Sequence, residues 1–568
     1  MPKFLTRPVR LPRLKPYVPE PDDPAIFWFN NERDDIVREV VRRQVERFGK
    51  SHETLEHALN EVAFHETQRL ERQRDSEAKE ELSQWRGLLR RISRMSDDAK
   101  RDALRSISER MARDIAGNFD PRVYQMATKV APALLTGVMK PTALPKDLAA
   151  LGQGAPSLDE LVTVEGDVEQ LKRLEKLGTL VYVPTHSSNL DSLALGYSLM
   201  RSNLAPVVYG AGKNLFTNPI ISFFMHNLGA YRVDRRIQSR LYKTALKNYS
   251  CVMIERGYHS LFFPGGTRSR AGMVERHLKL GLAGTALEAF ARNQVFGIKR
   301  PVFFVPTTIN YSLVMEAETL VEDHLKLTGE ARYIIEDDEF SRIDRWVTFF
   351  RKLIGTQGAC ILRYATPLDC FGNPVDEDGR SIAPGRGAVD AGTYVYRDGG
   401  PVLDDARDAA YTRELGETLL EVYRRETVLM TTQLVAHVMF RRLVRETPGL
   451  DLFGRLRVRG EVRIERGELL EDIGRTRDRA LALADAGTVR LSRMLSRATP
   501  AELLDRAIEV WDGYHTRCVA RQAGPEVIAE DPAMLFYYQN RVLDYAKDLA
   551  DDPDRGAALE IALLGAHA

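Results

Sequence analysis

The chain has 568 residues, 44% of them hydrophobic and 28% charged, with 81 basic and 80 acidic side chains. Since domains usually run to roughly 100–200 residues, this length allows a large core with accessory parts. The balanced charge excludes a protein that attracts nucleic acid or a membrane through its overall field, so any electrostatic site must be local. The four cysteines are far apart and form no CxxC pair, which argues against a zinc site or a disulfide framework and fits a reducing cytosol.

The N-terminal region is expected to be an arm followed by helices. Residues 1–21 are basic and rich in proline but lack the apolar segment of a signal peptide, and no run in the chain approaches the roughly 18–20 apolar residues of a membrane span. A disordered tail is favoured here over an arm that touches an anionic surface. From Ala25 to about Ala116, apolar residues spaced three and four apart among dense charges predict solvated helices that pack on something larger.

A more apolar helix is predicted to begin at Asp120-Pro121, because Asp caps helices and Pro suits their first turn. Such a helix could lie on a membrane interface or on the core of its own protein, and core packing is favoured. A linker rich in Gly, Pro and Leu follows from Pro141 to Pro156.

Beyond this linker, short β-rich runs alternate with helical patterns, which indicates an α/β layer. The predicted strands are Leu180–Pro184, Ala205–Tyr209, Ala230–Val233, His259–Phe263, Pro301–Thr308 and Ala359–Tyr364. From Asp404 the pattern is helical to the end, with one or two long helices over Asp405–Arg445. We therefore expect an N-terminal arm and helical region at 1–118, an α/β domain at 119–400 and a C-terminal helical region at 401–568.

The central motif is HSSNLD, which follows the first predicted strand and precedes a helical pattern. On a helix His186 and Asp191 would point about 140° apart and could not easily touch. In a tight loop between a strand and a helix they can meet. A carboxylate beside one imidazole nitrogen sets the tautomer and leaves the other nitrogen as a base. The ordinary alternative is a loop histidine next to a helix-capping aspartate.

Two further blocks carry arginines at strand ends. In GAYRVDRR, Arg235 and Arg236 stand where a ligand would lie in an open α/β sheet, although a basic surface turn is the simpler interpretation. In LFFPGGTRSR, two glycines let backbone N–H groups converge on an anion, and Arg268 and Arg270 could grip phosphate oxygens. The alternative for this block is an exposed Gly-Arg loop.

A fourth block, VFFVPTTINY, reads as a buried strand whose part would be to shape an apolar wall. In this order, the four blocks resemble those of the glycerolipid acyltransferase superfamily. The stretches AGKNLFTNP, NYSLVMEAET and AMLFYYQNRVLDY resemble its bacterial glycerol-3-phosphate acyltransferases. The resemblance covers roughly 120–368 and, loosely, the C-terminal helices. One departure is plain, because the family's third block usually carries a Glu where this chain has Gly265.

The resemblance implies a mixed α/β acyltransferase core with helical regions on both sides, and an enzyme that moves a fatty acyl group from a thioester to glycerol-3-phosphate. His186 would be the general base and Asp191 would orient it. The residues expected to bind the phosphorylated acceptor are Arg235, Arg268, Ser269, Arg270, Gly266, Lys213, Arg232 and Lys279. No metal or cofactor is expected, since acyl-CoA or acyl-ACP (acyl carrier protein) would serve as co-substrate.

Because the product enters the bilayer, we expect a cytoplasmic enzyme that attaches peripherally to the inner face of the cell membrane through Leu215–Leu228 or Val123–Met139. Two alternatives stay open: a lysophosphatidic acid acyltransferase that uses the same site, and a non-catalytic lipid-binding homologue, which Gly265 keeps in view. Nucleic-acid binding is disfavoured, because the sequence lacks a basic stripe with interleaved aromatic residues. A serine hydrolase would need a G-x-S-x-G elbow, which does not occur.

Overall fold

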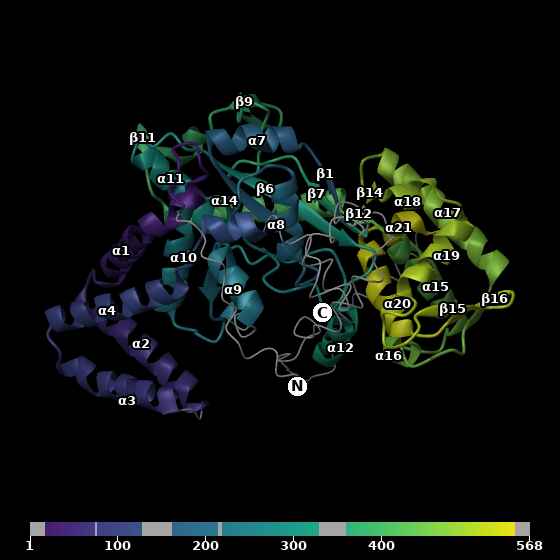
Figure 1. Ribbon diagram of the computed structural model, residues 1–568, viewed down its shortest axis with the longest axis horizontal. Helices are drawn as coiled ribbons and strands as arrows, with labels where there is room; N and C mark the ends of the chain where they lie inside the picture. Colours follow the sequence, from purple (N-terminus) through teal and green to yellow (C-terminus); the bar gives the residue numbers. More distant parts are fainter. Residues whose placement is uncertain (1–16, 74–75, 128–161, 214–218, 329–358, 551–568) are drawn as a thin grey trace, which may run out of the picture. The chain divides into compact units, whose positions relative to one another are not determined.

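The computed structural model describes residues 17–73, 76–127, 162–213, 219–328 and 359–550. These residues fall into two compact units, whose elements are labelled in Figure 1. We call residues 1–131 and 206–259 the smaller unit, and residues 132–205 and 260–568 the larger unit. This grouping differs from the predicted boundaries, because residues 206–259 group with the N-terminal helices, and the C-terminal helices group with residues 132–205 and 260–400. No helix in the described ranges has the length and apolar character needed to cross a bilayer.

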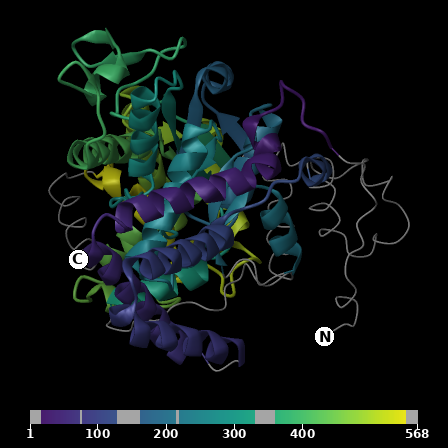
Figure 2. The same cartoon turned by 90° about the vertical axis from the view of Figure 1, so that its left-hand side faces the viewer.

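The smaller unit is mainly helical. Its elements are η2 (Ala25–Trp28), α1 (Phe29–Phe48), α2 (His52–Glu71), α3 (Ser76–Arg91), η3 (Ile92–Arg94), α4 (Asp97–Ile115), β3 (Val208–Gly212), α9 (Pro219–Asn227), β4 (Ala230–Val233) and α10 (Arg240–Glu255). Helix α1 lies beside both α4 and α10 (Figures 1 and 2). This packing explains why 206–259 belong here: apolar side chains of α10 such as Leu241 and Tyr249 complete the buried core of the N-terminal helices.

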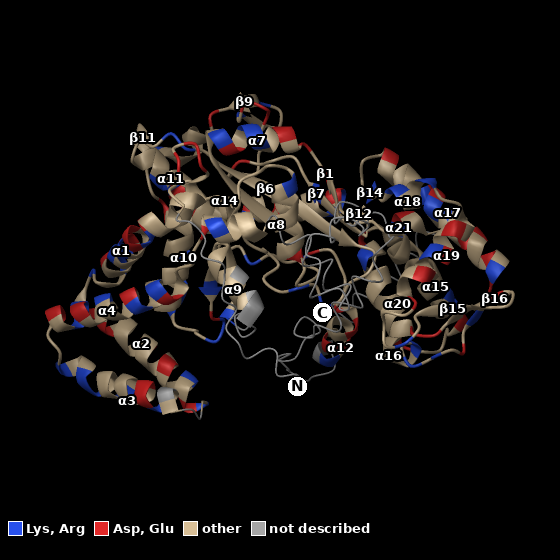
Figure 3. Ribbon diagram, viewed as in Figure 1, with Lys and Arg blue, Asp and Glu red and all other residues tan. Residues whose placement is uncertain are grey.

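The predicted helices over 25–116 are confirmed, and their charges behave as expected. Acidic and basic residues are mixed along α1–α4 (Figure 3). On α1, Arg42 pairs with Glu39 one turn away, an exposed arrangement that contributes little stability. A stronger anchor is buried: Arg43 donates two hydrogen bonds of 2.8 and 2.6 Å to Glu255 on α10. The helix predicted from Asp120 is described only as far as Ala127, where it is helical, and the rest lies outside the described residues.

The larger unit begins with a mixed sheet in the order β1-β7-β6-β2-β5. Its elements, up to the end of the sheet, are β1 (Val162–Glu165), α7 (Val168–Leu177), β2 (Thr179–Pro184), α8 (Asp191–Arg201), β5 (Ser260–Leu261), α11 (Ala283–Val295), β6 (Val302–Tyr311), α12 (Ala317–Thr328) and β7 (Cys360–Tyr364). Strand β2 runs parallel to β5 and β6, whereas β7 runs antiparallel to β6. Every residue of β2 and β6 is buried, so β2 and the first half of β6 are almost wholly apolar, although β6 also buries Thr307, Thr308 and Asn310.

The mixed α/β fold class is therefore correct, and so are the predicted strands apart from their ends. Strand β3 starts later than expected and β5 is shorter. Strand β1 was missed, because its sequence VTVE is short and ends in a charge. It pairs in parallel with β7, whose sequence comes almost two hundred residues later. In the smaller unit, β3 and β4 form a parallel pair.

The rest of the larger unit contains two small hairpins and a helical region. The elements are β8 (Ser381–Ala383), β9 (Gly387–Val389), η8 (Ala391–Val395), β10 (Tyr396–Arg397), β11 (Gly400–Pro401), α14 (Asp405–Glu426), β12 (Val428–Leu429), α15 (Thr431–Glu446), α16 (Leu452–Arg455), β13 (Arg463–Glu465), α17 (Arg466–Asp485), β14 (Arg490–Leu491), α18 (Arg493–Arg497), α19 (Pro500–Trp511), β15 (Ala520–Ala523), β16 (Glu526–Ala529), α20 (Pro532–Gln539), η9 (Asn540–Tyr545) and α21 (Ala546–Leu549).

The prediction of helices from Asp404 to the end is wrong where this region forms strands. Strands β13, β16 and β15 form an antiparallel sheet, and β12 and β14 form a short parallel pair. Strands β15 and β16 are joined at Gly524-Pro525, where Gly524 adopts a φ of +64°. That dipeptide is a turn signal, but the strands beside it are short and partly charged, so their pattern did not stand out. The prediction of one or two long helices over Asp405–Arg445 is confirmed, and there are two, α14 and α15.

Candidate functional site

The loop between β2 and α8 brings the two central predicted residues together. Strand β2 ends at Pro184, and α8 begins at Asp191. Nδ1 of His186 lies 2.8 Å from Oδ2 of Asp191. The same Oδ2 accepts the backbone N–H groups of Ser187 and Ser188, at 2.6 and 3.0 Å, which wraps the loop around the carboxylate. The predicted contact between His186 and Asp191 is confirmed.

The other oxygen of Asp191 is also occupied. Oδ1 accepts a hydrogen bond of 2.8 Å from the hydroxyl of Tyr311, at the end of β6. Asp191 is fully buried, and burial together with the nearby Asp191 charge raises the pKa of Tyr311 well above its usual value, so the tyrosine stays a donor. With Nδ1–H directed at this fixed carboxylate, the lone pair of the imidazole sits on Nε2. His186 is thereby arranged as a base.

The ring of His186 is held on its face as well as at its edge. Phe263, just beyond β5, stacks on it with a centroid distance of 4.0 Å and an interplanar angle of 21°. The His186 side chain is 15% exposed, so the ring is covered but still reachable. A phenyl ring on one face and a carboxylate at Nδ1 leave the imidazole little freedom to turn.

The third block adjoins the same loop. The backbone N–H of Ser269 donates a 2.8 Å hydrogen bond to the carbonyl of His186, and the Ser269 hydroxyl donates to the carbonyl of Met273 at 2.8 Å. Gly266 has a φ of +73°, and a Cβ there would lie 2.5 Å from Cδ of Lys279. Lys279 also donates its backbone N–H to the carbonyl of Pro264. The predicted residues Gly266, Ser269 and Lys279 therefore lie in one loop cluster beside His186.

Arg268 belongs to this cluster through a residue that sequence reasoning did not single out. Its Nη1 lies 3.5 Å from Oε1 of Glu316, which is completely buried. Glu316 also accepts hydrogen bonds from the Ser188 hydroxyl at 2.7 Å and from the Asn189 backbone at 3.0 Å. One carboxylate thus joins the HSSNLD loop to the arginine of the third block. The only signal for Glu316 was its place in the NYSLVMEAET stretch.

Arg270 has a different neighbour. Its Nε lies 2.8 Å from Oδ2 of Asp323 on α12, and Asp323 is buried while Arg270 is partly exposed. This ion pair holds the guanidinium against α12. Both arginines of the third block thus lie near a buried carboxylate, Arg268 near Glu316 and Arg270 nearer to Asp323, and the predicted role of Arg270 in acceptor binding stays a prediction.

Three predicted residues belong to the smaller unit. Lys213 lies 3.7 Å from Asp114 and 3.8 Å from Asp234, and Arg232 lies 3.7 Å from Asp114. Arg235 follows the end of β4 and is exposed. Within this unit the three cations occupy one neighbourhood around the strand ends, and their predicted role in acceptor binding stays a prediction.

The prediction that the fourth block only shapes an apolar wall is wrong for Tyr311. Its ring does lie in the buried end of β6, but its hydroxyl serves Asp191. Alternation along a strand identifies the side that faces the core, yet it says nothing of which polar group a tyrosine hydroxyl will meet. A contact between residues 311 and 191 depends on β6 lying next to β2.

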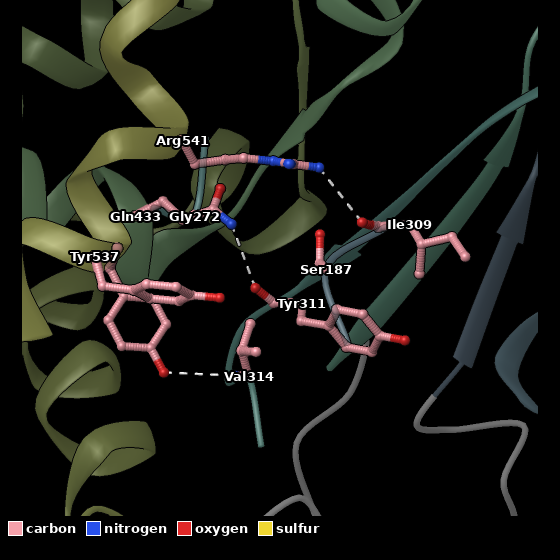
Figure 4. A pocket seen from close by; sticks show the side chains of 9 residues that line it. Ser187, Gly272, Ile309, Tyr311, Val314, Gln433, Tyr537 and Arg541 are labelled. Atoms are coloured by element: carbon pink, nitrogen blue, oxygen red, sulfur yellow. Dashed lines mark hydrogen bonds between the residues drawn. The ribbon is translucent and has the colours of Figure 1, made fainter. Parts of the chain in front are cut away.

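A small cavity of about 20 Å³ lies behind the loop (Figure 4). Its wall includes Ser187, Tyr311 and Arg541, and the Arg541 side chain points toward the carbonyl of Ile309. The volume suits one water molecule rather than a substrate. Because Arg541 belongs to η9, the C-terminal region contributes to the surroundings of the loop that carries His186.

Comparisons with known proteins find acyltransferases that are similar to part of this chain. Residues 165–310 match the family model named Acyltransferase. A glycerol-3-phosphate acyltransferase of Histophilus somni (strain 129Pt) is 33% identical over 171 residues, which are 29% of this chain and 20% of that protein. The one from Actinobacillus pleuropneumoniae serotype 5b (strain L20) is 31% identical over 207 residues, 36% of this chain and 23% of that protein. The matched stretch thus spans about a fifth of the length of these relatives.

A solved structure is also similar over part of the chain. It is the 1-acyl-sn-glycerophosphate (LPA) acyltransferase PlsC from Thermotoga maritima. The match has 15% sequence identity and a TM-score of 0.23, and covers 45% of this chain and 86% of that one.

Proposed function

Because residues 165–310 match the Acyltransferase family model and similar proteins are named glycerol-3-phosphate acyltransferase, we propose that this protein transfers a fatty acyl group from a thioester to glycerol-3-phosphate. The product would be lysophosphatidic acid, a precursor of phospholipids. The observation that carries the proposal is the 2.8 Å contact between Nδ1 of His186 and the buried Asp191 carboxylate. The named relatives support the choice of acceptor.

The chemistry needs one base and two aligned substrates. Nε2 of His186 takes the proton of the acceptor hydroxyl as its oxygen attacks the thioester carbonyl. The tetrahedral intermediate then collapses, the C–S bond breaks, and the thiolate leaves with the proton returned by the imidazolium. Asp191 keeps the ring in the required tautomer throughout. Proximity of the two substrates supplies much of the rate, so no covalent acyl-enzyme is needed.

The acceptor's phosphate group would be held by the cations of the third block. Arg268 is the first candidate, since Glu316 ties it to the same loop that carries His186. Lys279 and the backbone at Gly266, which lie next to each other in the same loop cluster, are the next candidates. Arg270 and Ser269 would contribute less directly, because their polar groups already bind Asp323 and Met273. Arg235, Arg232 and Lys213 complete the proposed set.

The proposal also includes the acyl donor and the place in the cell where the protein acts. Acyl-CoA or acyl-ACP would supply the thioester, with no further cofactor. A peripheral association with the inner face of the cell membrane would let the lipid product leave the site. Of the two segments expected to bind lipid, 219–227 form α9, while 214–218 and most of 123–139 lie outside the described residues. Flotation with anionic liposomes tests the association, and a protein that stays wholly unbound contradicts it.

The decisive experiment offers the purified protein acyl-CoA or acyl-ACP together with each of three acceptors: glycerol-3-phosphate, lysophosphatidic acid and dihydroxyacetone phosphate. We expect turnover with glycerol-3-phosphate, and a loss of at least about 100-fold in kcat for His186→Ala. His57→Ala on α2 is the matched control, because this histidine is exposed. Full activity of His186→Ala contradicts the mechanism. Preference for lysophosphatidic acid changes the acceptor, and no turnover with any acceptor favours a lipid-binding homologue.

A further inference from the structure

The third block lacks a carboxylate at the position where the family it resembles usually has one, and the structure shows what fills that space. A Cβ placed on Gly265 would lie 3.3 Å from Cγ and 3.8 Å from Oε1 of Glu275. Between these two distances lies the carbonyl oxygen of Thr267, at 3.6 Å from the added Cβ. The backbone of Gly265 is outside the left-handed region, so its conformation does not require glycine. The space that a side chain at position 265 would enter is therefore occupied by the side chain of Glu275.

Glu275 acts directly on the loop that carries the candidate base. Its Oε1 accepts the backbone N–H of His186 at 2.6 Å. Its Oε2 is buried and has no hydrogen-bond partner among the described residues. Breaking the one hydrogen bond of this buried carboxyl group would leave it without a partner, which is costly. The Glu275 carboxyl group and the His186 backbone N–H therefore hold each other in place.

A residue of the C-terminal region, Arg541, contacts the segment that contains Glu275. Arg541, on η9, is 4% exposed and donates to the carbonyls of Met273 and Ile309 and to Oδ1 of Asn310, at 3.3 to 3.4 Å (Figure 4). Met273 lies two residues before Glu275, so Arg541 fixes the segment that presents the carboxylate. Burial raises the pKa of Glu275, and the positive charge of Arg541 and the His186 N–H oppose that rise.

We propose that Glu275 is a positioning residue, which supplies from later in the chain the carboxylate that is absent at position 265. It fixes the backbone at His186 so that Nε2 stays aimed at the acceptor hydroxyl. The inference deepens the proposed acyl transfer and rests on it. Misplacement of a reacting group by about 1 Å can cost a hundredfold in rate, so one backbone hydrogen bond is enough to matter.

The test moves the carboxylate between the two positions. We expect Glu275→Ala to lower kcat by about 30-fold or more while the KM for glycerol-3-phosphate changes by less than about threefold, because substrate groups are untouched. Glu275→Gln keeps an oxygen acceptor and should retain most of kcat. The double variant Gly265→Glu with Glu275→Ala should recover at least about tenfold over Glu275→Ala, since the new side chain enters the vacated space. Glu322→Ala, an exposed residue on α12, is the control.

Hydrogen exchange of the peptide that contains His186 separates this inference from the proposed activity. Protection of the His186 amide should fall in Glu275→Ala and return in the double variant, whether or not any acceptor is turned over. Wild-type kcat and protection in a folded Glu275→Ala protein would overturn the inference. So would a folded double variant no better than Glu275→Ala. If Glu275→Ala does not fold, rescue of folding and activity by Gly265→Glu supports the replacement, and failure of rescue contradicts it.

Discussion

The hydroxyl of Tyr311 donates a hydrogen bond of 2.8 Å to Oδ1 of Asp191, whose Oδ2 lies at 2.8 Å from Nδ1 of His186. The two residues come from different elements, Tyr311 from the end of β6 and Asp191 from the start of α8. The carboxylate is thus tied on both oxygens. A tied carboxylate can hold the imidazole in one orientation without turning itself.

Replacing Tyr311 by Phe tests this tie. Removing the hydroxyl costs about 1–2 kcal/mol of interaction with a charged group, so we expect kcat to fall about 5- to 30-fold with little change in KM. Steady-state kinetics with glycerol-3-phosphate measure the effect. Tyr364→Phe is the matched control, because its buried hydroxyl bonds to Ser198 at 2.7 Å instead of the site. Equal losses of kcat in both variants would mean that the Tyr311 hydroxyl has only a structural role.

The two arginines of the third block should behave differently. Arg268 adjoins the HSSNLD loop through Glu316, whereas Arg270 is paired with Asp323 on α12. We expect Arg268→Ala to raise the KM for glycerol-3-phosphate at least about tenfold, since a charge-assisted bond to phosphate is lost. For Arg270→Ala we expect a rise of less than about threefold. A larger effect from Arg270→Ala would place the phosphate on the α12 side of the loop.

The ion pairs of Glu426 predict how the stability of the larger unit changes at acid pH. Burial raises its pKa, but hydrogen bonds from Arg490, Arg363 and Arg425 outweigh burial and lower the pKa to about 2 from 4.5. A carboxyl group whose pKa is lower in the folded than in the unfolded chain stabilises the folded state. This contribution is complete at pH values above the pKa of the unfolded chain, and it is lost as the pH falls from about 4.5 toward 2. The contribution at neutral pH is on the order of 3 kcal/mol.

Urea unfolding of wild type and Glu426→Gln at several pH values measures that contribution. We expect the variant to be less stable at pH 7, and the difference between the two proteins to narrow steadily below about pH 4.5. A difference that stays constant down to pH 3 would mean that the ion pairs of Glu426 add nothing. The comparison uses midpoints of the same transition, because a chain with two units need not unfold in one step.

Gly272 tests the contact between the third block and the C-terminal helices. Its φ is +77°, and an added Cβ would lie 2.4 Å from the carbonyl oxygen of Tyr537. We expect Gly272→Ala to lower the free energy of unfolding by more than about 2 kcal/mol, from backbone strain and the clash together. Gly297→Ala is the control, since φ is +70° but no atom lies within 4 Å of its added Cβ. Thermal denaturation of both variants separates strain, which they share, from the clash.

Local pattern was sufficient for long or strongly apolar segments whose partners lie nearby in the chain. The spacing of apolar residues predicted the helices of 25–116, and continuous apolar runs predicted β2 and β6. His186 and Asp191 could be paired in advance because the loop that joins them is short. A turn signal at Gly524-Pro525 was present too, but the short charged strands beside it concealed β15 and β16.

Other parts of the site depend on contacts between distant segments. Tyr311 reaches Asp191 because β6 lies beside β2, and Glu316 reaches Ser188 across the same neighbourhood. Glu275 reaches the His186 backbone only after the third block has folded back on the loop. No local periodicity marks these residues, because a buried acid or tyrosine resembles an exposed one in sequence.

The sequence by itself predicted most of the long helices, the strands β2 and β6 and the contact between His186 and Asp191, since each rests on neighbouring residues or on a conspicuous motif. Only the tertiary structure decided which carboxylates hold the loop, and that Glu275 occupies the space beside Gly265. The physical reason is that hydrogen bonds between segments far apart in the chain are set by strand order and packing, which appear only when the whole sheet has formed.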